Sequence, residues 1–125
     1  MQFMDIPTDS LKGSIELFCV KLGAKLIEQT DHFAHLEFFE QEVIFHFDPS
    51  YREEKQPGVY SFVIPEESDF TNIYKQCEEL EMVRPLRTLA GHVSQKAFSI
   101  RGVSGHEMEF KHYLPMMFEL KESEE

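Results

Sequence analysis

Basic residues and long apolar runs are both scarce in this 125-residue chain. Twelve Lys and Arg stand against 23 Asp and Glu, which leaves a formal net charge of −11 at pH 7. Because this charge repels phosphate backbones and anionic lipid headgroups, we expect neither nucleic acid nor a membrane as a partner. No apolar run approaches the roughly 18 residues of a membrane span, and the first ten residues do not resemble a targeting segment. The sequence therefore favours a cytoplasmic protein.

Cysteine is rare and tryptophan is absent. Cys19 and Cys77 are too few and too far apart for a disulfide scaffold or a zinc motif, so we expect reduced thiols in the core. Phenylalanine, in contrast, occurs 12 times, and 42% of the residues are hydrophobic. A chain of this length and composition is expected to form one domain with a packed core.

Hydrophobic periodicity divides the chain into two similar halves. Helical spacing predicts helices over residues 10–22 and 68–81. Alternating or β-rich segments predict the strands, at residues 2–6, 24–30, 33–48 as a hairpin, 59–64, 84–89, 95–101 and 107–113. The polar segment 49–58 connects the halves. We therefore expect a single domain over 1–118, with one module at about 1–50, a second at about 57–113, and an acidic tail at 119–125.

Numerical offsets between the halves support a duplication. Adding 58 to Cys19 gives Cys77, and flanking apolar positions of the two predicted helices match as well. Adding 63 maps Phe47 onto Phe110 in the final strands, so the second half carries five extra residues. The matches favour a repeated βαβββ unit.

A repeated βαβββ unit predicts an α+β fold in which two modules form a cup-shaped mixed sheet with the helices on the convex face. Alternation along the hairpins then places polar groups in the hollow. The side chains expected there are His35, Glu37, Phe39, Ile44, His46, Asp48, Ser99, Arg101, Glu107, Glu109 and Lys111. This lining makes the hollow a candidate binding site.

Two segments carry a resemblance to a known family. Residues 14–18 (SIELF), followed by Leu22 and Gly23, resemble the first-helix signature of the glyoxalase, bleomycin-resistance and extradiol dioxygenase superfamily, also called vicinal oxygen chelate proteins. Residues 98–110 resemble its closing hairpin, in which a Gly-rich turn leads to a strand with a metal-ligand glutamate. The resemblance extends to Tyr113 and implies the glyoxalase-like fold.

The resemblance also implies positions for metal ligands. Glu109 matches the family's ligand glutamate, and the offset of 63 places His46 at the equivalent point of the first half. The family's other two ligands come from the first strand of each half. In the first half, spacing from Ser14 puts Phe3 at the ligand position. Because neither first strand contains histidine, the four-ligand set is incomplete.

Two functions remain open. One is a metal-free protein that binds a small molecule, with a cationic ligand in an acidic groove. The other is a lyase, isomerase, transferase or dioxygenase that uses Glu109 with a divalent metal (Mn, Ni, Co, Zn or Fe), its site completed by His35, Asp5 or Gln2. The incomplete ligand set favours the first. In either case the candidate ligand-binding residues are His35, Glu37, His46, Ser99, Arg101 and Glu107.

The histidines support two interpretations. His35 and His46 are expected to be cross-strand neighbours beside Glu37, which makes either a binding cluster or two solvated side chains. The remaining histidines receive no role. The resemblance further implies a homodimer, and the apolar residues of the tail from Leu114 onward are candidates for a cover or a dimer contact.

Overall fold

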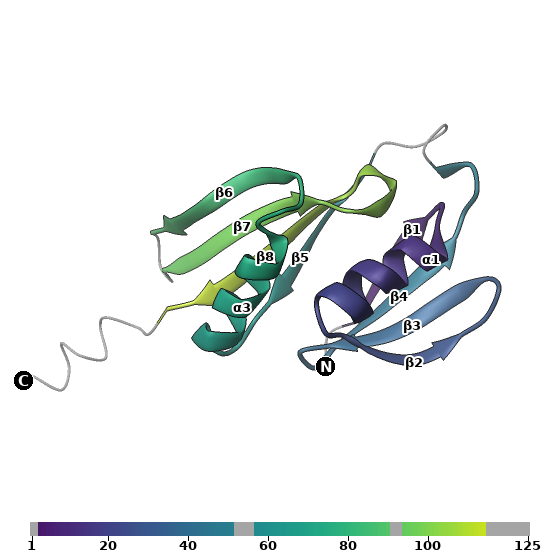
Figure 1. Cartoon of the computed structure of the whole chain (residues 1–125), viewed down its shortest axis with the longest axis horizontal. Helices are drawn as coiled ribbons and strands as arrows, with labels where there is room; N and C mark the ends of the chain where they lie inside the picture. Colours follow the sequence, from purple (N-terminus) through teal and green to yellow (C-terminus); the bar gives the residue numbers. More distant parts are fainter. Residues whose placement is uncertain (1–2, 52–56, 91–93, 115–125) are drawn as a thin grey trace, which may run out of the picture.

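The computed structural model describes residues 3–51, 57–90 and 94–114. Its elements form two modules in chain order (Figure 1). The first comprises β1 (Phe3–Thr8), α1 (Leu11–Ile15) with its π-helical continuation η1 (Glu16–Lys21), β2 (Lys25–Gln29), β3 (Phe33–Phe38) and β4 (Gln41–Phe47). The second comprises β5 (Val59–Val63), α3 (Glu67–Cys77), β6 (Met82–Leu89), β7 (Gln95–Arg101), the turn η2 (Val103–Gly105) and β8 (Glu107–Tyr113).

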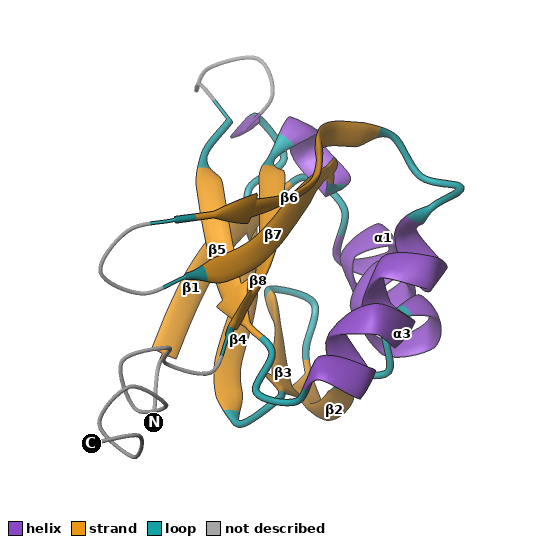
Figure 2. Cartoon of the chain, turned by 90° about the vertical axis from the view of Figure 1, so that its left-hand side faces the viewer, coloured by secondary structure: helices purple, strands orange, loops and turns teal. Residues whose placement is uncertain are grey.

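Each module contains a four-stranded mixed sheet. The strand orders are β1-β4-β3-β2 and β5-β8-β7-β6, and the first strand of each module runs parallel to the last. The α+β class and the two βαβββ modules are confirmed, although hydrogen bonding divides the expected single sheet into two. Figure 2 shows α1 and α3 on the same side of the sheets. We call the side of the sheets opposite these helices the open face.

The first helical segment begins at a capped residue and widens into a π-helix. The Ser10 side chain accepts a hydrogen bond from the Gly13 N–H at 3.0 Å, as an N-cap does. The π-helical turn spaces the buried residues Ser14, Phe18 and Leu22 four apart. In α3 the buried residues are Phe70, Ile73 and Cys77, so the first spacing is three residues and the second is four. The counterpart of Cys77 is therefore Leu22, and the offset of 58 through the half-buried Cys19 is wrong.

Strand register also corrects the offset of 63. Ile6 pairs with Phe45 in module one, Phe62 pairs with Phe110 in module two, and all four residues are fully buried. Phe45 is thus the counterpart of Phe110, whereas Phe47 is 42% exposed. A slip of two residues preserves the face of every side chain, so alternation alone does not reveal it.

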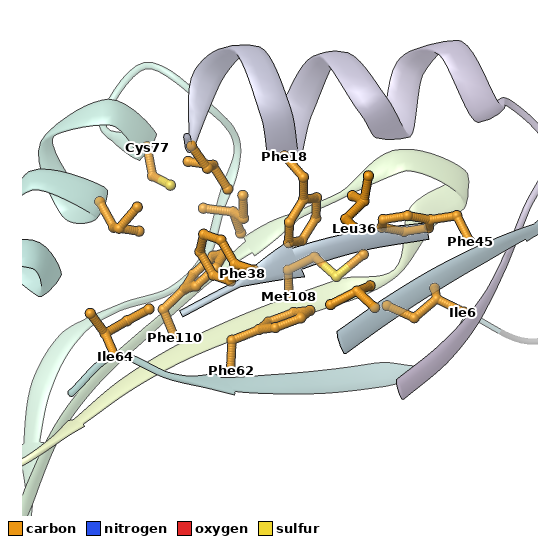
Figure 3. Packing of buried hydrophobic residues seen from close by; sticks show 14 of the residues in the cluster. Ile6, Phe18, Leu36, Phe38, Phe45, Phe62, Ile64, Cys77, Met108 and Phe110 are labelled. Atoms are coloured by element: carbon orange, nitrogen blue, oxygen red, sulfur yellow. The ribbon is translucent and has the colours of Figure 1, made fainter. Parts of the chain in front are cut away.

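The core is continuous across the two modules. The ring of Phe18 lies 5.5, 5.3 and 5.2 Å from the rings of Phe38, Phe45 and Phe62 (Figure 3). Phe62 in turn stacks on Phe110 at 5.6 Å. Since Phe62 and Phe110 belong to module two, the helical segment of module one buries apolar surface against both modules.

Two side chains join the modules by hydrogen bonds to backbone groups. Gln41, at the start of β4, accepts from the Val63 N–H at 2.9 Å and donates to the Val63 carbonyl at 3.1 Å. His106, just before β8, accepts at Nδ1 from the Gly58 N–H at 3.0 Å and donates from Nε2 to the Pro7 carbonyl at 2.7 Å. Each module thus contacts the first strand of the other.

Both cysteines are free thiols; Cys77 lies in the core, as expected, whereas Cys19 is only half-buried. Burial raises the pKa of Cys77 to about 12, so its thiol stays protonated at neutral pH. In the part of the chain that the structure describes, no helix is long and apolar enough to cross a membrane. Gln2 and residues 115–125, which include the acidic tail and the apolar residues that follow Leu114, lie outside the described residues.

Candidate functional site

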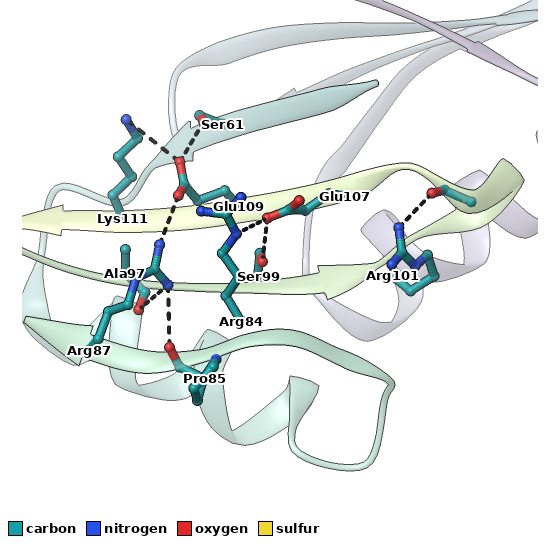
Figure 4. A network of polar contacts seen from close by, with 11 residues as sticks. Ser61, Arg84, Pro85, Arg87, Ala97, Ser99, Arg101, Glu107, Glu109 and Lys111 are labelled. Atoms are coloured by element: carbon teal, nitrogen blue, oxygen red, sulfur yellow. Dashed lines mark hydrogen bonds and ion pairs between the residues drawn. The ribbon is translucent and has the colours of Figure 1, made fainter. Parts of the chain in front are cut away.

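Module two presents a network of charged and hydroxyl groups on the open face (Figure 4). Strand register places Glu109 between Ser61 of β5 and Ser99 of β7, and it pairs Arg101 with Glu107. Of the predicted site residues, the ligand-binding candidates Ser99 and Glu107 therefore lie together with Glu109, the predicted catalytic or metal-binding residue. The site is built on three strands, which fix the backbone positions of its side chains.

Glu109 is enclosed by donors. Its Oε1 accepts a hydrogen bond from the Ser61 hydroxyl at 2.7 Å, and its Oε2 accepts from Arg87 Nη2 at 3.3 Å. Lys111 Nζ lies 3.8 Å from Oε1. The side chain of Glu109 is 17% exposed. Both carboxylate oxygens are therefore already engaged by neighbouring side chains.

Glu107 has an equivalent set of partners. Its Oε2 accepts a hydrogen bond from the Ser99 hydroxyl at 2.8 Å and forms an ion pair with Arg84, whose Nε lies 3.0 Å away. The carboxylate is buried, with 11% of the side chain exposed, whereas the side chain of Arg84 is 58% exposed. Each glutamate of the network is thus bound by one serine and one arginine, with the arginine of Glu107 nearer to solvent.

Arg84 and Arg87 are site residues that the sequence pattern did not predict. Both lie on β6, whose pairing with β7 contains register shifts between Met82 and Arg84 and again between Arg84 and Arg87. The shifts interrupt the alternation from which the open face was predicted. The signal available in the sequence was Pro85 between two arginines, because proline in a strand marks an edge strand or a bulge.

Arg101 lies apart from this network, at the edge of the open face. Its Nη1 donates to the Gly105 carbonyl at 3.0 Å, and its Nε lies 3.7 Å from Glu81 Oε2. It lines a cavity of about 470 Å³ beside the turn that precedes β8, together with Pro57, Glu81, Gly102, Ser104 and Gly105. The guanidinium is therefore bound to the turn and does not contact Glu109.

In module one each candidate histidine pairs with a carboxylate. His46 Nδ1 lies 2.7 Å from Asp5 Oδ1, and His35 Nε2 lies 2.9 Å from Glu42 Oε1. Asp5 and His46 are about half exposed. Glu37 lies opposite Glu42 in the strand register. The histidines do not form the shared cluster with Glu37 that was one of the two expectations, since each is paired with a different acidic residue.

Solved structures with a similar backbone identify the architecture. A protein from Alicyclobacillus acidocaldarius described as a glyoxalase/bleomycin resistance protein/dioxygenase is 21% identical, with a TM-score of 0.75 over 90% of each chain. Lactoylglutathione lyase from Agrobacterium tumefaciens is 11% identical, with a TM-score of 0.70 over 90% of this chain and 92% of its own. A glyoxalase/bleomycin resistance protein/dioxygenase from Nocardioides is 16% identical, with a TM-score of 0.64 over 90% of this chain and 82% of its own.

The chain has the glyoxalase-type fold. No protein-family model matches the sequence, and no curated protein sequence matches it significantly. The likeness in backbone therefore establishes the fold, and the chemistry of the site has to be argued from the residues themselves.

On the glyoxalase-type fold, strand register shows which first-strand residue lies beside Glu109 and which pair of module-one residues corresponds to it. Ser61 pairs with Glu109, and the counterparts in module one are Asp5 and Ile44, which also pair with each other. Phe3, the residue expected from spacing, pairs instead with Glu42. The counterpart of Glu109 is Ile44 and not His46, which lies two residues further along β4.

These four residues do not fit a divalent metal ion. Isoleucine has no ligand atom, and Ser61 donates its hydroxyl proton to Glu109. Within residues 3–51, 57–90 and 94–114, no group of three or more His, Cys, Asp or Glu side chains is placed to hold a metal. Of the four residues, only Asp5 and Glu109 carry a carboxylate that could bind a metal. Glu109 is already paired with Arg87.

Proposed function

We propose that this glyoxalase-type chain binds a small organic molecule on its open face without the four-ligand metal site. The observation that carries the proposal is the replacement of a ligand by Ile44, combined with the engagement of Glu109 by Ser61 and Arg87. The network of module two has the groups that orient a polar ligand, namely carboxylates, guanidinium groups and hydroxyls on neighbouring strands.

Apolar side chains on the same face support a ligand with a hydrophobic part. Phe3 and Val59 begin the first strands of the two modules and are 61% and 62% exposed. Val59 pairs with Glu107, so it lies beside the polar network. A molecule that covers Val59 while its polar group reaches the network would remove apolar surface from water.

The second candidate is the divalent-metal-dependent lyase, isomerase, transferase or dioxygenase. The observation in its favour is Glu109, which occupies the last strand of module two at the position matched to the ligand glutamate. In that proposal Glu109 would hold the metal or move a proton, and His46, two residues beyond the position equivalent to Glu109, would be a further ligand. It requires the Arg87 and Ser61 contacts of Glu109 to be exchanged for the metal.

We further propose that the protein acts as a cytoplasmic homodimer. Exposed apolar side chains lie on the edge strands: Leu26 and Ile27 of β2 are 39% and 47% exposed, and Leu86 of β6 is 42% exposed. A second copy of the chain would cover them. Sedimentation velocity measures the oligomeric state directly.

Ligand mapping on the ¹⁵N-labelled protein tests the open-face proposal. In the presence of EDTA, a panel of small aromatic and aliphatic acids, amides and amines is expected to shift amide signals of β5, β7 and β8 and to leave those of α1 and α3 in place. A bulky Ser61→Trp substitution on the open face should remove these shifts, whereas Thr71→Trp on the exposed side of α3 should preserve them. Shifts confined to the helices, or shifts that require added metal, would contradict the proposal.

A further inference from the structure

The network of module two carries positive charge in excess. Arg84, Arg87 and Lys111 face two carboxylates, Glu107 and Glu109, so three positive charges against two negative ones leave a surplus of one. This surplus occurs in a chain whose net charge is −11. The acidic groove expected from composition is therefore absent from this part of the open face, because its carboxylates are already compensated.

Arg84 has an unused hydrogen-bonding edge. Its Nε contacts Glu107, and its two terminal nitrogens have no hydrogen-bond partner within the described part of the chain. Glu107 is buried while the Arg84 side chain is 58% exposed, so the carboxylate lies beneath the guanidinium. A guanidinium binds carboxylates through two parallel N–H groups. The edge formed by Nη1 and Nη2 of Arg84 matches such a group.

Arg87 adds a second positive charge that the protein already holds in place. Its Nη1 donates to the carbonyls of Pro85 and Ala97 at 3.3 and 3.4 Å, and its Nη2 reaches Glu109 at 3.3 Å. The side chain is 25% exposed. Because these contacts order the guanidinium before any ligand arrives, little further conformational entropy is lost on binding.

We propose that the open face of module two is a carboxylate-binding subsite whose ligand is a small organic monoanion with an apolar body. The carboxylate binds the outer edge of Arg84, with Arg87 and Lys111 supplying the surrounding positive charge, and the apolar body covers Val59. This assignment rests on the proposed function, because it names the ligand class of the same face. The ligand's charge is then opposite in sign to that of the cationic ligand suggested by the acidic composition.

Three matched probes test the sign of the ligand charge. Phenylacetate, phenylacetamide and phenethylamine share an aromatic body and differ in charge, and each is titrated into the full ¹⁵N-labelled chain with EDTA present. Phenylacetate is expected to shift the Arg84 and Arg87 Nε–Hε signals saturably, and phenylacetamide to bind about tenfold more weakly, as expected when charge-assisted hydrogen bonds are lost. Phenethylamine should leave both arginine signals in place.

Variants of Arg84 test whether its Nη1–Nη2 edge binds the carboxylate. Arg84→Gln is expected to weaken phenylacetate binding about tenfold, and Arg84→Lys, which keeps the charge but not the paired N–H groups, should recover only part of that loss. Lys96→Gln is the matched control, because Lys96 pairs with Glu67 of α3. Amide spectra of the variants report whether the fold is retained, and Arg84→Lys keeps the test valid if Arg84→Gln unfolds the chain.

The outcomes separate this inference from the proposed function. Preferential binding of phenethylamine, or equal binding of all three probes on the open face, overturns the carboxylate subsite and leaves the proposed function intact. Failure of all three probes to shift an open-face signal also overturns the subsite, and the wider panel described above then decides the proposed function by itself.

Discussion

Replacement of Phe18 by alanine is expected to lower the free energy of unfolding by about 3–5 kcal/mol. The ring is fully buried and lies within 5.5 Å, centre to centre, of the rings of Phe38, Phe45 and Phe62. Alanine leaves a cavity that the surrounding strands fill only partly, because they are fixed in two hydrogen-bonded sheets. Urea denaturation followed by circular dichroism measures the change.

The matched control is Phe47→Ala. Because Phe47 is 42% exposed, its replacement removes less buried surface than that of Phe18. Its expected effect is about 1 kcal/mol or less. Because Phe18 bridges the modules, hydrogen exchange should show faster opening of β5 and β8 as well as of β3 and β4 in Phe18→Ala. Destabilisation restricted to module one would contradict the continuous core and the single domain proposed for residues 1–118.

His106→Ala is expected to cost about 2–4 kcal/mol of stability. The imidazole is fully buried and joins the Gly58 N–H to the Pro7 carbonyl, so its removal leaves a cavity and deprives two backbone groups of this partner. It also lies between the rings of Tyr51 and Tyr60, at 4.9 and 5.0 Å. Chemical denaturation measures the loss, and hydrogen exchange at Gly58 should accelerate.

Two variants bracket this prediction. His32→Ala changes an exposed histidine and should leave stability within about 0.5 kcal/mol of the original. His106→Gln keeps a side-chain donor and acceptor and should recover part of the lost stability. An unchanged exchange rate at Gly58 in His106→Ala would show that the imidazole does not join the modules.

The fold was predictable because each local pattern reports one physical property. Alternation placed Val43 and Phe45 against the helices, and both are fully buried. Offsets between the halves depend in addition on register, which short apolar patterns do not determine. The two-residue slip that aligned His46 with Glu109 kept every side chain on its face, and only the pairing of Ile6 with Phe45 and of Phe62 with Phe110 reveals it.

The candidate site was predictable where it follows regular strands. Ser99, Glu107 and Glu109 lie on β7 and β8 without register shifts, and the structure brings them together. Arg84 and Arg87 lie on the irregular β6, where alternation fails.

The partners of the histidines follow from longer-range features. His46 contacts Asp5 because β1 crosses over to run beside β4, and such a parallel pairing is not apparent from the hairpin itself. His106 received no role because one histidine in a turn carries no spacing, yet its ring contacts both modules.

Titration of the EDTA-treated ¹⁵N-labelled protein with Mn²⁺ tests most directly whether the open face functions without a metal site. Mn²⁺ is paramagnetic and broadens the signals of nearby nuclei. With Ile44 and Ser61 at two of the four ligand positions, we predict weak broadening spread over the surface carboxylates, unaltered in Glu109→Gln. Saturable broadening centred on Glu109, abolished by Glu109→Gln and preserved in the control Glu67→Gln, would contradict the account and establish a metal centre.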